Sequence, residues 1–87
     1  MEKYKFHYDA GHGWLEVELN ELKELGIEKE ISQFSYQKDE KVYLEEDCDV
    51  AVFIKAKKIN PNDFNSLIEE VDDGDYSKIR NYGSYEV

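Results

Sequence analysis

The first eighteen residues carry a pattern that is typical of a β-hairpin and that few other local structures would satisfy. Within residues 3–8, a tyrosine or phenylalanine stands at every second position, which is the period of a half-buried strand. Residues 9–13 supply turn chemistry, with an aspartate and two glycines, and residues 14–18 resume a β-rich run. The sequence therefore predicts two paired strands, at 3–8 and 14–18, joined by this turn.

A short helix and a second hairpin are predicted next. Leucines at three-residue spacing share one helical face, Asn20 can cap the helix, and Gly26 stands where a left-handed residue would end it. We therefore expect a helix over residues 20–25. Beyond it, residues 34–37 and 42–45 are extended runs separated by a polar turn, and this arrangement predicts a hairpin.

A longer helix is predicted over residues 48–58, where apolar side chains follow helical spacing. Asp47 or Asp49 is placed to accept the free N–H groups of its first turn, and lysines complement its last turn. The following segment fits either a helix that begins at Asn60 or a strand over 66–72. We favour the strand, because a helix here would crowd acidic residues at its negative end.

The length of the chain limits it to one core. A chain of 87 residues buries roughly 60–65% of its unfolded surface, which suffices for a single domain and not for two. We therefore expect one α+β domain over residues 1–87. It consists of a small antiparallel sheet of two hairpins plus a possible fifth strand, with the short and the longer helix packed on one face.

The charge of the chain excludes several functions. Twenty-one acidic residues against eleven basic ones give a net charge of −10, which repels phosphate backbones and anionic lipid.

No apolar run approaches the roughly 20 residues of a membrane span, and the N-terminus lacks a signal-peptide core. The single cysteine forms no internal disulfide. We expect a cytoplasmic protein that binds neither nucleic acid nor membrane directly.

The stretch VYLEEDCDV, residues 42–50, places four carboxylates around the only cysteine. It lacks the glycine of a calcium-binding EF-hand loop, and Cys48 has too few soft partners nearby for zinc, so we expect no metal and no cofactor. A helix N-terminus would lower the pKa of Cys48 while the adjacent aspartates raise it, so we assign no catalytic residue. At least one carboxylate is expected to cap the helix, and the others form either a solvated face or a recognition surface.

Acidic residues gather in two clusters. Residues 39–49 contain six acids and one lysine, and residues 69–75 contain five acids and no base. If both clusters lie on one face, they would imitate a phosphate backbone and occupy the basic groove of a nucleic-acid-binding protein; otherwise the charge only maintains solubility. The predicted contacts are Glu45, Glu46, Asp47, Asp49, Asp72, Asp73 and Asp75, with Tyr43 as an aromatic anchor.

A second candidate site is centred on the turn histidine. Gly11 and Gly13 could expose His12, and Asp9 is near enough to hold its tautomer, although a structural histidine beside a core tryptophan is the simpler interpretation. The only arginine, Arg80, is expected to pair with a carboxylate and so to tie the C-terminal segment to the domain. The alternative ligand site comprises Asp9, His12, Trp14, Arg80 and Tyr82.

Three strings, DAGHGWLEV, ISQFSYQKDEKVYLEEDCD and IRNYGSY, together cover 35 of the 87 residues. In them the chain resembles a family of small proteins from phages, plasmids and other mobile elements, for which no activity is established. The resemblance implies an accessory protein that acts against a host enzyme or defence system.

The expected function is therefore a non-enzymatic acidic protein, a monomer or weak homodimer, that inhibits a host nucleic-acid-binding or defence protein, as DNA mimics and anti-CRISPR or anti-restriction proteins do. The alternatives are a small-ligand-binding protein or minor enzyme centred on His12 and Arg80, and a structural or regulatory subunit.

Overall fold

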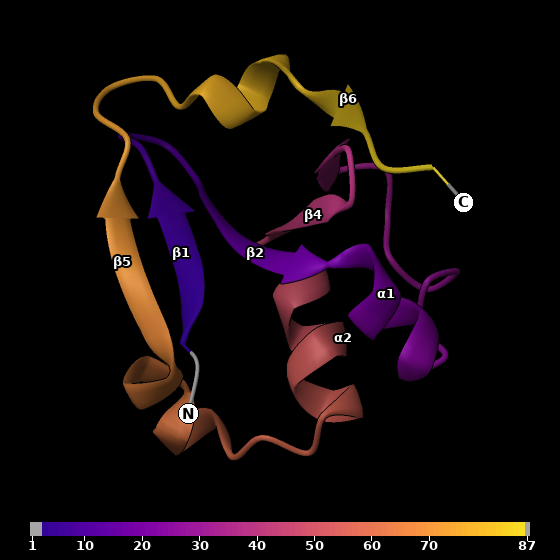
Figure 1. The fold of residues 1–87 in the computed structure, drawn as a ribbon. Helices are drawn as coiled ribbons and strands as arrows, with labels where there is room; N and C mark the ends of the chain where they lie inside the picture. Colours follow the sequence, from indigo (N-terminus) through magenta and orange to yellow (C-terminus); the bar gives the residue numbers. More distant parts are fainter. Residues whose placement is uncertain (1–2, 87) are drawn as a thin grey trace.

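The computed structural model describes residues 3–86, and within them one mixed sheet organises the chain (Figure 1). The strand order is β5-β1-β2-β4-β3-β6; β5 runs parallel to β1, and all other neighbours are antiparallel. The strands are β1 (Tyr4–Tyr8), β2 (Gly13–Glu18), β3 (Tyr36–Lys38), β4 (Lys41–Glu45), β5 (Ile68–Asp72) and β6 (Gly83–Ser84).

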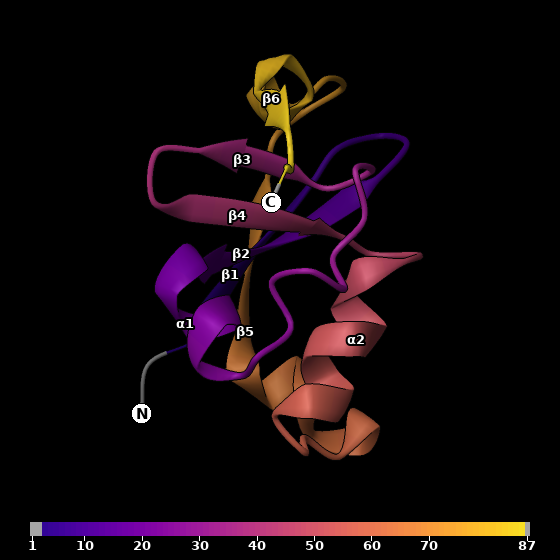
Figure 2. The same ribbon diagram turned by 90° about the vertical axis from the view of Figure 1, so that its right-hand side faces the viewer.

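Two α-helices and two 3₁₀ helices complete the described fold: α1 (Leu19–Glu24), α2 (Asp49–Ala56), η1 (Pro61–Leu67) and η2 (Lys78–Asn81). Figure 2 shows α1 and α2 on the same side of the sheet. Leu22 of α1 and Phe53 of α2 are fully buried in one cluster with Leu15 and Leu44 from the two central strands. Neither α-helix of the described chain is both long and apolar enough to cross a membrane.

The other face of the sheet has a smaller aromatic core. Successive residues of a strand point to opposite faces, so Leu15 joins the helical side while its neighbour Trp14 joins the other. There Trp14 and Tyr43 pack with Ile79 of η2, which crosses this face between β5 and β6 (Figure 1). The C-terminal segment therefore covers an aromatic patch that the two helices do not reach.

The α+β class is confirmed, as are both hairpins and the long helix. The uncertain segment contains both predicted kinds of structure in succession: Asn60 accepts a hydrogen bond from the backbone N–H of Asn62 and caps η1, and β5 follows directly. The sheet has a sixth, two-residue strand, and the expectation of a purely antiparallel sheet was wrong. Because α2 and η1 carry the chain back along the sheet after β4, β5 enters beside β1 in the same direction.

The N-caps predicted for the two α-helices were wrong, although the left-handed Gly26, with φ 72°, is confirmed. Asn20 lies inside α1, because the chain passes from β2 straight into the helix and the N–H of Leu19 already donates to the carbonyl of Glu40. The N-cap of α2 is Cys48, and no side-chain hydrogen bond caps that position.

Candidate functional site

Acidic residues from both clusters lie at one end of the sheet because of the strand directions, whereas Asp39 and Glu40 precede β4 at the opposite end. β2 is antiparallel to both β1 and β4, and β5 is parallel to β1, so β1, β4 and β5 all run the same way. Asp9 follows β1, Glu45 to Asp47 end and follow β4, and Asp72 to Asp75 end and follow β5. Glu46 and Glu70, one from each cluster, line a common hollow beside the β1–β2 turn. We call this region the acidic end.

The Asp9 carboxylate anchors the C-terminal segment at this end. Its Oδ2 accepts hydrogen bonds from Arg80 Nε at 2.6 Å and from the Ser77 N–H at 2.8 Å, and its Oδ1 accepts one from Arg80 Nη2 at 2.8 Å. The N–H groups of Gly11 and His12 also donate to Oδ1. Arg80 above all, together with these backbone donors, holds the pKa of Asp9 far below its usual range. The expected pairing of Arg80 with a carboxylate is thus confirmed, and the pairing is bidentate.

The guanidinium of Arg80 is also held between two aromatic rings. Its Cζ lies 5.4 Å from the centroid of Trp14 and 5.3 Å from that of Tyr76. Such stacking is favourable for a planar cation over the electron-rich face of a ring. The two bonds to Asp9 use Nε and Nη2, which leaves Nη1 for another acceptor.

A pocket of about 310 Å³ opens beside this arrangement. Its walls combine aromatic surface, two carboxylates, an imidazole, a thiol and the Arg80 guanidinium. The lining residues are His12, Trp14, Phe34, Tyr36, Glu45, Asp47, Cys48 and Arg80.

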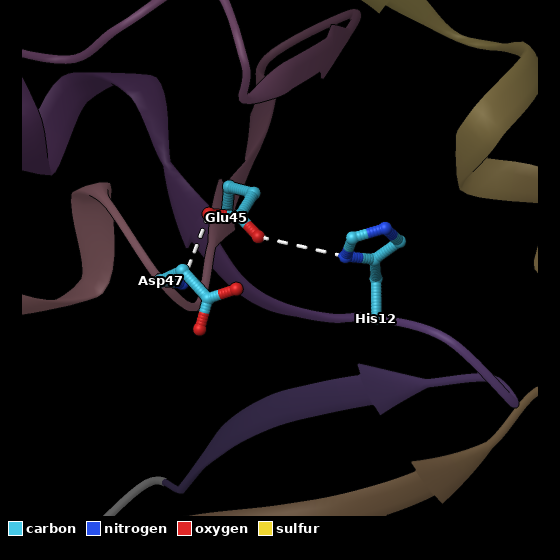
Figure 3. Close-up of side chains that lie close together, drawn as sticks. All are labelled: His12, Glu45 and Asp47. Atoms are coloured by element: carbon cyan, nitrogen blue, oxygen red, sulfur yellow. Dashed lines mark hydrogen bonds and ion pairs between the residues drawn. The ribbon is translucent and has the colours of Figure 1, made fainter.

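The carboxylate of Glu45 organises the acidic wall of the pocket. Glu45 is 9% exposed, and its Oε2 accepts the backbone N–H of Asp47 at 2.9 Å. Its Oε1 lies 3.8 Å from Nδ1 of His12, and Figure 3 shows the imidazole and this carboxylate facing each other with Asp47 alongside. Ligand atoms from the three side chains lie within 4.8 Å of one another, close enough to share a divalent cation. Exposed acids often gather in this way without an ion, and we assign no metal here.

Cys48 is exposed at the pocket rim but is not activated. Partial desolvation, followed by a hydrogen bond to Glu45 and the charges of Asp49 and Asp47, raises the pKa of Cys48 above its ordinary value. A thiol that stays protonated near neutral pH is a poor nucleophile. The site therefore provides binding groups rather than a reactive cysteine.

Three of the predicted contact residues are buried. Glu45 lies in the pocket wall, whereas Asp49 and Tyr43 lie inside the fold, and the role of partner contact that was predicted for these two was wrong. Asp49 is 2% exposed, because it accepts hydrogen bonds from the N–H and hydroxyl of Ser32 and from the hydroxyl of Ser35. Tyr43 is 8% exposed because Tyr82 packs on it, with ring centroids 5.2 Å apart. Burial, together with the nearby charge of Glu16, raises the pKa of Tyr43 to about 12.

The other predicted acids differ in their exposure. Asp73 is half-buried and accepts a hydrogen bond from the Ser77 hydroxyl, and Glu45 is buried in the pocket wall. The exposed acids of the predicted set are Glu46, Asp47, Asp72 and Asp75.

The alternative ligand site is only partly brought together. His12, Trp14 and Arg80 line the pocket. Asp9 does not line it but accepts hydrogen bonds from Arg80. Tyr82 lies outside the pocket, where it packs against Tyr43. Sequence reasoning missed Phe34, whose side chain is 64% exposed at the pocket wall. The sequence feature that could have identified Phe34 is its spacing from Tyr36, because side chains two positions apart point to the same face of an extended chain.

Comparison of the chain with known protein families, curated proteins and solved structures finds no match.

Proposed function

We propose that this protein is a non-enzymatic binding protein whose acidic end docks on a basic surface of another protein. The observation that carries the proposal is the common direction of β1, β4 and β5, which brings acidic residues from two clusters, far apart in sequence, to one end of the sheet. Charges gathered in this way attract a basic partner over several ångströms and set its orientation.

The basic residues reinforce this polarity. Lys55, Lys57 and Lys58 lie at the far end of α2, where Lys57 Nζ donates to the hydroxyl of Tyr4 at the start of β1. In Figure 1 the last turn of α2 lies at the opposite end of the fold from the arrowheads of β1 and β5, which the acidic residues of the acidic end follow. The lysines that end α2 therefore lie away from the acidic end.

The resemblance to proteins of mobile elements suggests the kind of partner. A host nucleic-acid-binding or defence protein carries the basic groove that such an acidic end would fit, and the chain would inhibit it in the cytoplasm by occupying that groove. The net charge of −10 supports this proposal, because it suits a phosphate-like competitor of nucleic acid.

The test compares two variants of equal net charge. The acidic-end variant replaces four exposed acids by their amides: Glu46→Gln, Asp47→Asn, Asp72→Asn and Asp75→Asn. The control variant replaces four exposed acids away from that end: Glu24→Gln, Asp39→Asn, Glu40→Gln and Asp63→Asn. None of the eight side chains is buried, so both variants are expected to fold.

Each immobilised protein is exposed to a bacterial lysate at about 0.05 M and about 0.5 M salt, because salt screens exposed charges. We expect the native and control proteins to retain a nucleic-acid-binding protein at low salt only, and the acidic-end variant to lose it. Equal retention by both variants would contradict the proposal.

A second candidate function is binding of a free small ligand in the pocket. It is favoured by the meeting of His12, Trp14 and Arg80 in one hollow, where Nη1 of Arg80 is available to an anionic group. Saturable binding of benzoate, lost in His12→Ala, would favour this function over the first.

A further inference from the structure

We infer that the pocket beside Trp14 receives one arginine side chain of the basic partner. This inference rests on the proposed function and adds to it the chemistry of a central contact. It follows from three properties of the pocket: its charge, its aromatic walls and its size.

The charge of the pocket favours a cation. Glu45 and Asp47 face it with two carboxylates, whereas the one cationic lining residue, Arg80, is already neutralised by Asp9. The carboxylate of Glu45 is largely removed from water, so a guanidinium placed beside it would form a charge-assisted hydrogen bond in a partly desolvated site. An anionic guest would have to approach both carboxylates.

The aromatic walls favour a planar cation over an ammonium group. Phe34, 64% exposed, and Tyr36 line the side of the pocket and offer aromatic surface to an entering side chain. A guanidinium can stack on such rings while its edge donates two hydrogen bonds, which lysine cannot do. Arg80 shows the same stacking in the adjacent space, between Trp14 and Tyr76.

The size of the pocket suits one side chain. Its volume of about 310 Å³ is at the lower limit of the roughly 300–1,000 Å³ that ligand pockets span. A nucleotide or other large cofactor would not be enclosed, whereas the head and stem of one long side chain would be.

The single tryptophan makes a direct test possible, because all tryptophan fluorescence reports on Trp14 at this pocket. N-acetyl-arginine amide is titrated into the native protein, alongside N-acetyl-citrulline amide, which has the same shape and no charge. We expect a saturable change in emission with the arginine compound and at least about tenfold weaker binding of the citrulline compound.

Variants localise the binding. Asp47→Asn and Glu46→Gln each remove one exposed negative charge from neighbouring positions, but only Asp47 lines the pocket. We expect Asp47→Asn to weaken binding of the arginine compound roughly tenfold and Glu46→Gln to change it less than about twofold. Phe34→Ala, which alters no charge, should also weaken it severalfold.

The inference is overturned if the arginine compound gives no saturable change, if citrulline binds equally well, or if the Asp47 and Glu46 variants are equivalent. Failure of the proposed function has a different readout, namely equal lysate capture by the two four-site variants. Phe34→Ala retains every charge and therefore separates the two statements. Loss of arginine binding together with weakened capture of the partner supports both. Loss of arginine binding with undiminished salt-sensitive capture supports the proposed function and overturns the inference.

Discussion

Arg80 and Asp9 are separated by 71 residues in sequence and meet in a two-bond ion pair at 2.6 and 2.8 Å. The side chain of Asp9 is fully covered, and the same carboxylate also accepts backbone N–H groups from its own turn and from Ser77. One residue therefore shapes the β1–β2 turn and holds the C-terminal segment across the aromatic face of the sheet. The pocket depends on this contact, because Arg80 forms one of its walls.

The Asp9–Arg80 pair predicts a loss of stability in acid. The pKa of Asp9 is held well below its unfolded value of about 3.9, so the unfolded chain binds a proton at a pH where the folded chain does not. The stabilisation is complete above about pH 5 and declines as the pH falls below about 4. We expect Asp9→Asn to be less stable at neutral pH and to show a shallower decline of its unfolding free energy between about pH 5 and 2.

Urea unfolding at several pH values measures how the unfolding free energy depends on pH. The matched control is Asp75→Asn, which changes an exposed aspartate. The control should follow the native protein. The same acid dependence in Asp9→Asn and Asp75→Asn would show that the pair does not contribute.

The sequence predicted local structure well and long-range pairing poorly. Alternation within residues 3–8 and the glycines of the following turn specify a hairpin between neighbours in sequence. The partner of β5 is not encoded in this way, because periodicity indicates a strand without identifying the strand beside it. The length and direction of the connection through α2 and η1 decide that pairing, and these emerge only from the packed structure.

The site was predictable in its components more than in its assembly. Arg80 was expected to pair with a carboxylate, but one arginine facing 21 acidic residues does not reveal that Asp9 is the partner. Asp47 and Asp49 flank Cys48 and look equivalent in sequence, yet one is exposed and the other buried. Asp49 is buried because the hydroxyls of Ser32 and Ser35 donate hydrogen bonds to it. The local sequence around Asp49 does not predict these contacts.

Asp49 is expected to be a structural residue, and its removal should cost substantial stability. Asp49→Ala would leave the N–H of Ser32 and the buried hydroxyl of Ser35 without their acceptor, at a cost of about 2–4 kcal/mol. Asp47→Ala, at an exposed position, should change the free energy by no more than about 0.5 kcal/mol. Urea unfolding of the two variants gives both values, and equal effects would refute the assignment of Asp49.

Cys48 should react slowly despite its exposure. Because its pKa is raised in the folded protein, its thiolate fraction at about pH 7 is smaller than that of an unfolded chain. We expect iodoacetamide to modify the native protein several times more slowly than the same chain in denaturant, with the difference shrinking as the pH rises toward 10. Mass spectrometry over time measures both rates. Faster modification of the native protein would instead indicate an activated thiol.

Gly13 is expected to be required by close packing at the start of β2. A Cβ at this position would lie 2.5 Å from Cζ and 2.8 Å from Cε2 of Phe6. Gly13→Ala must therefore displace this half-buried ring, which packs against the core, and should cost about 1–3 kcal/mol. Adding Phe6→Leu should recover part of that loss, because the smaller side chain clears the added methyl group. Gly83→Ala, whose Cβ meets no atom closer than 4.0 Å, is the control and should be tolerated. A double-mutant cycle by urea unfolding measures the coupling, and strictly additive effects of the Gly13 and Phe6 changes would rule out the clash.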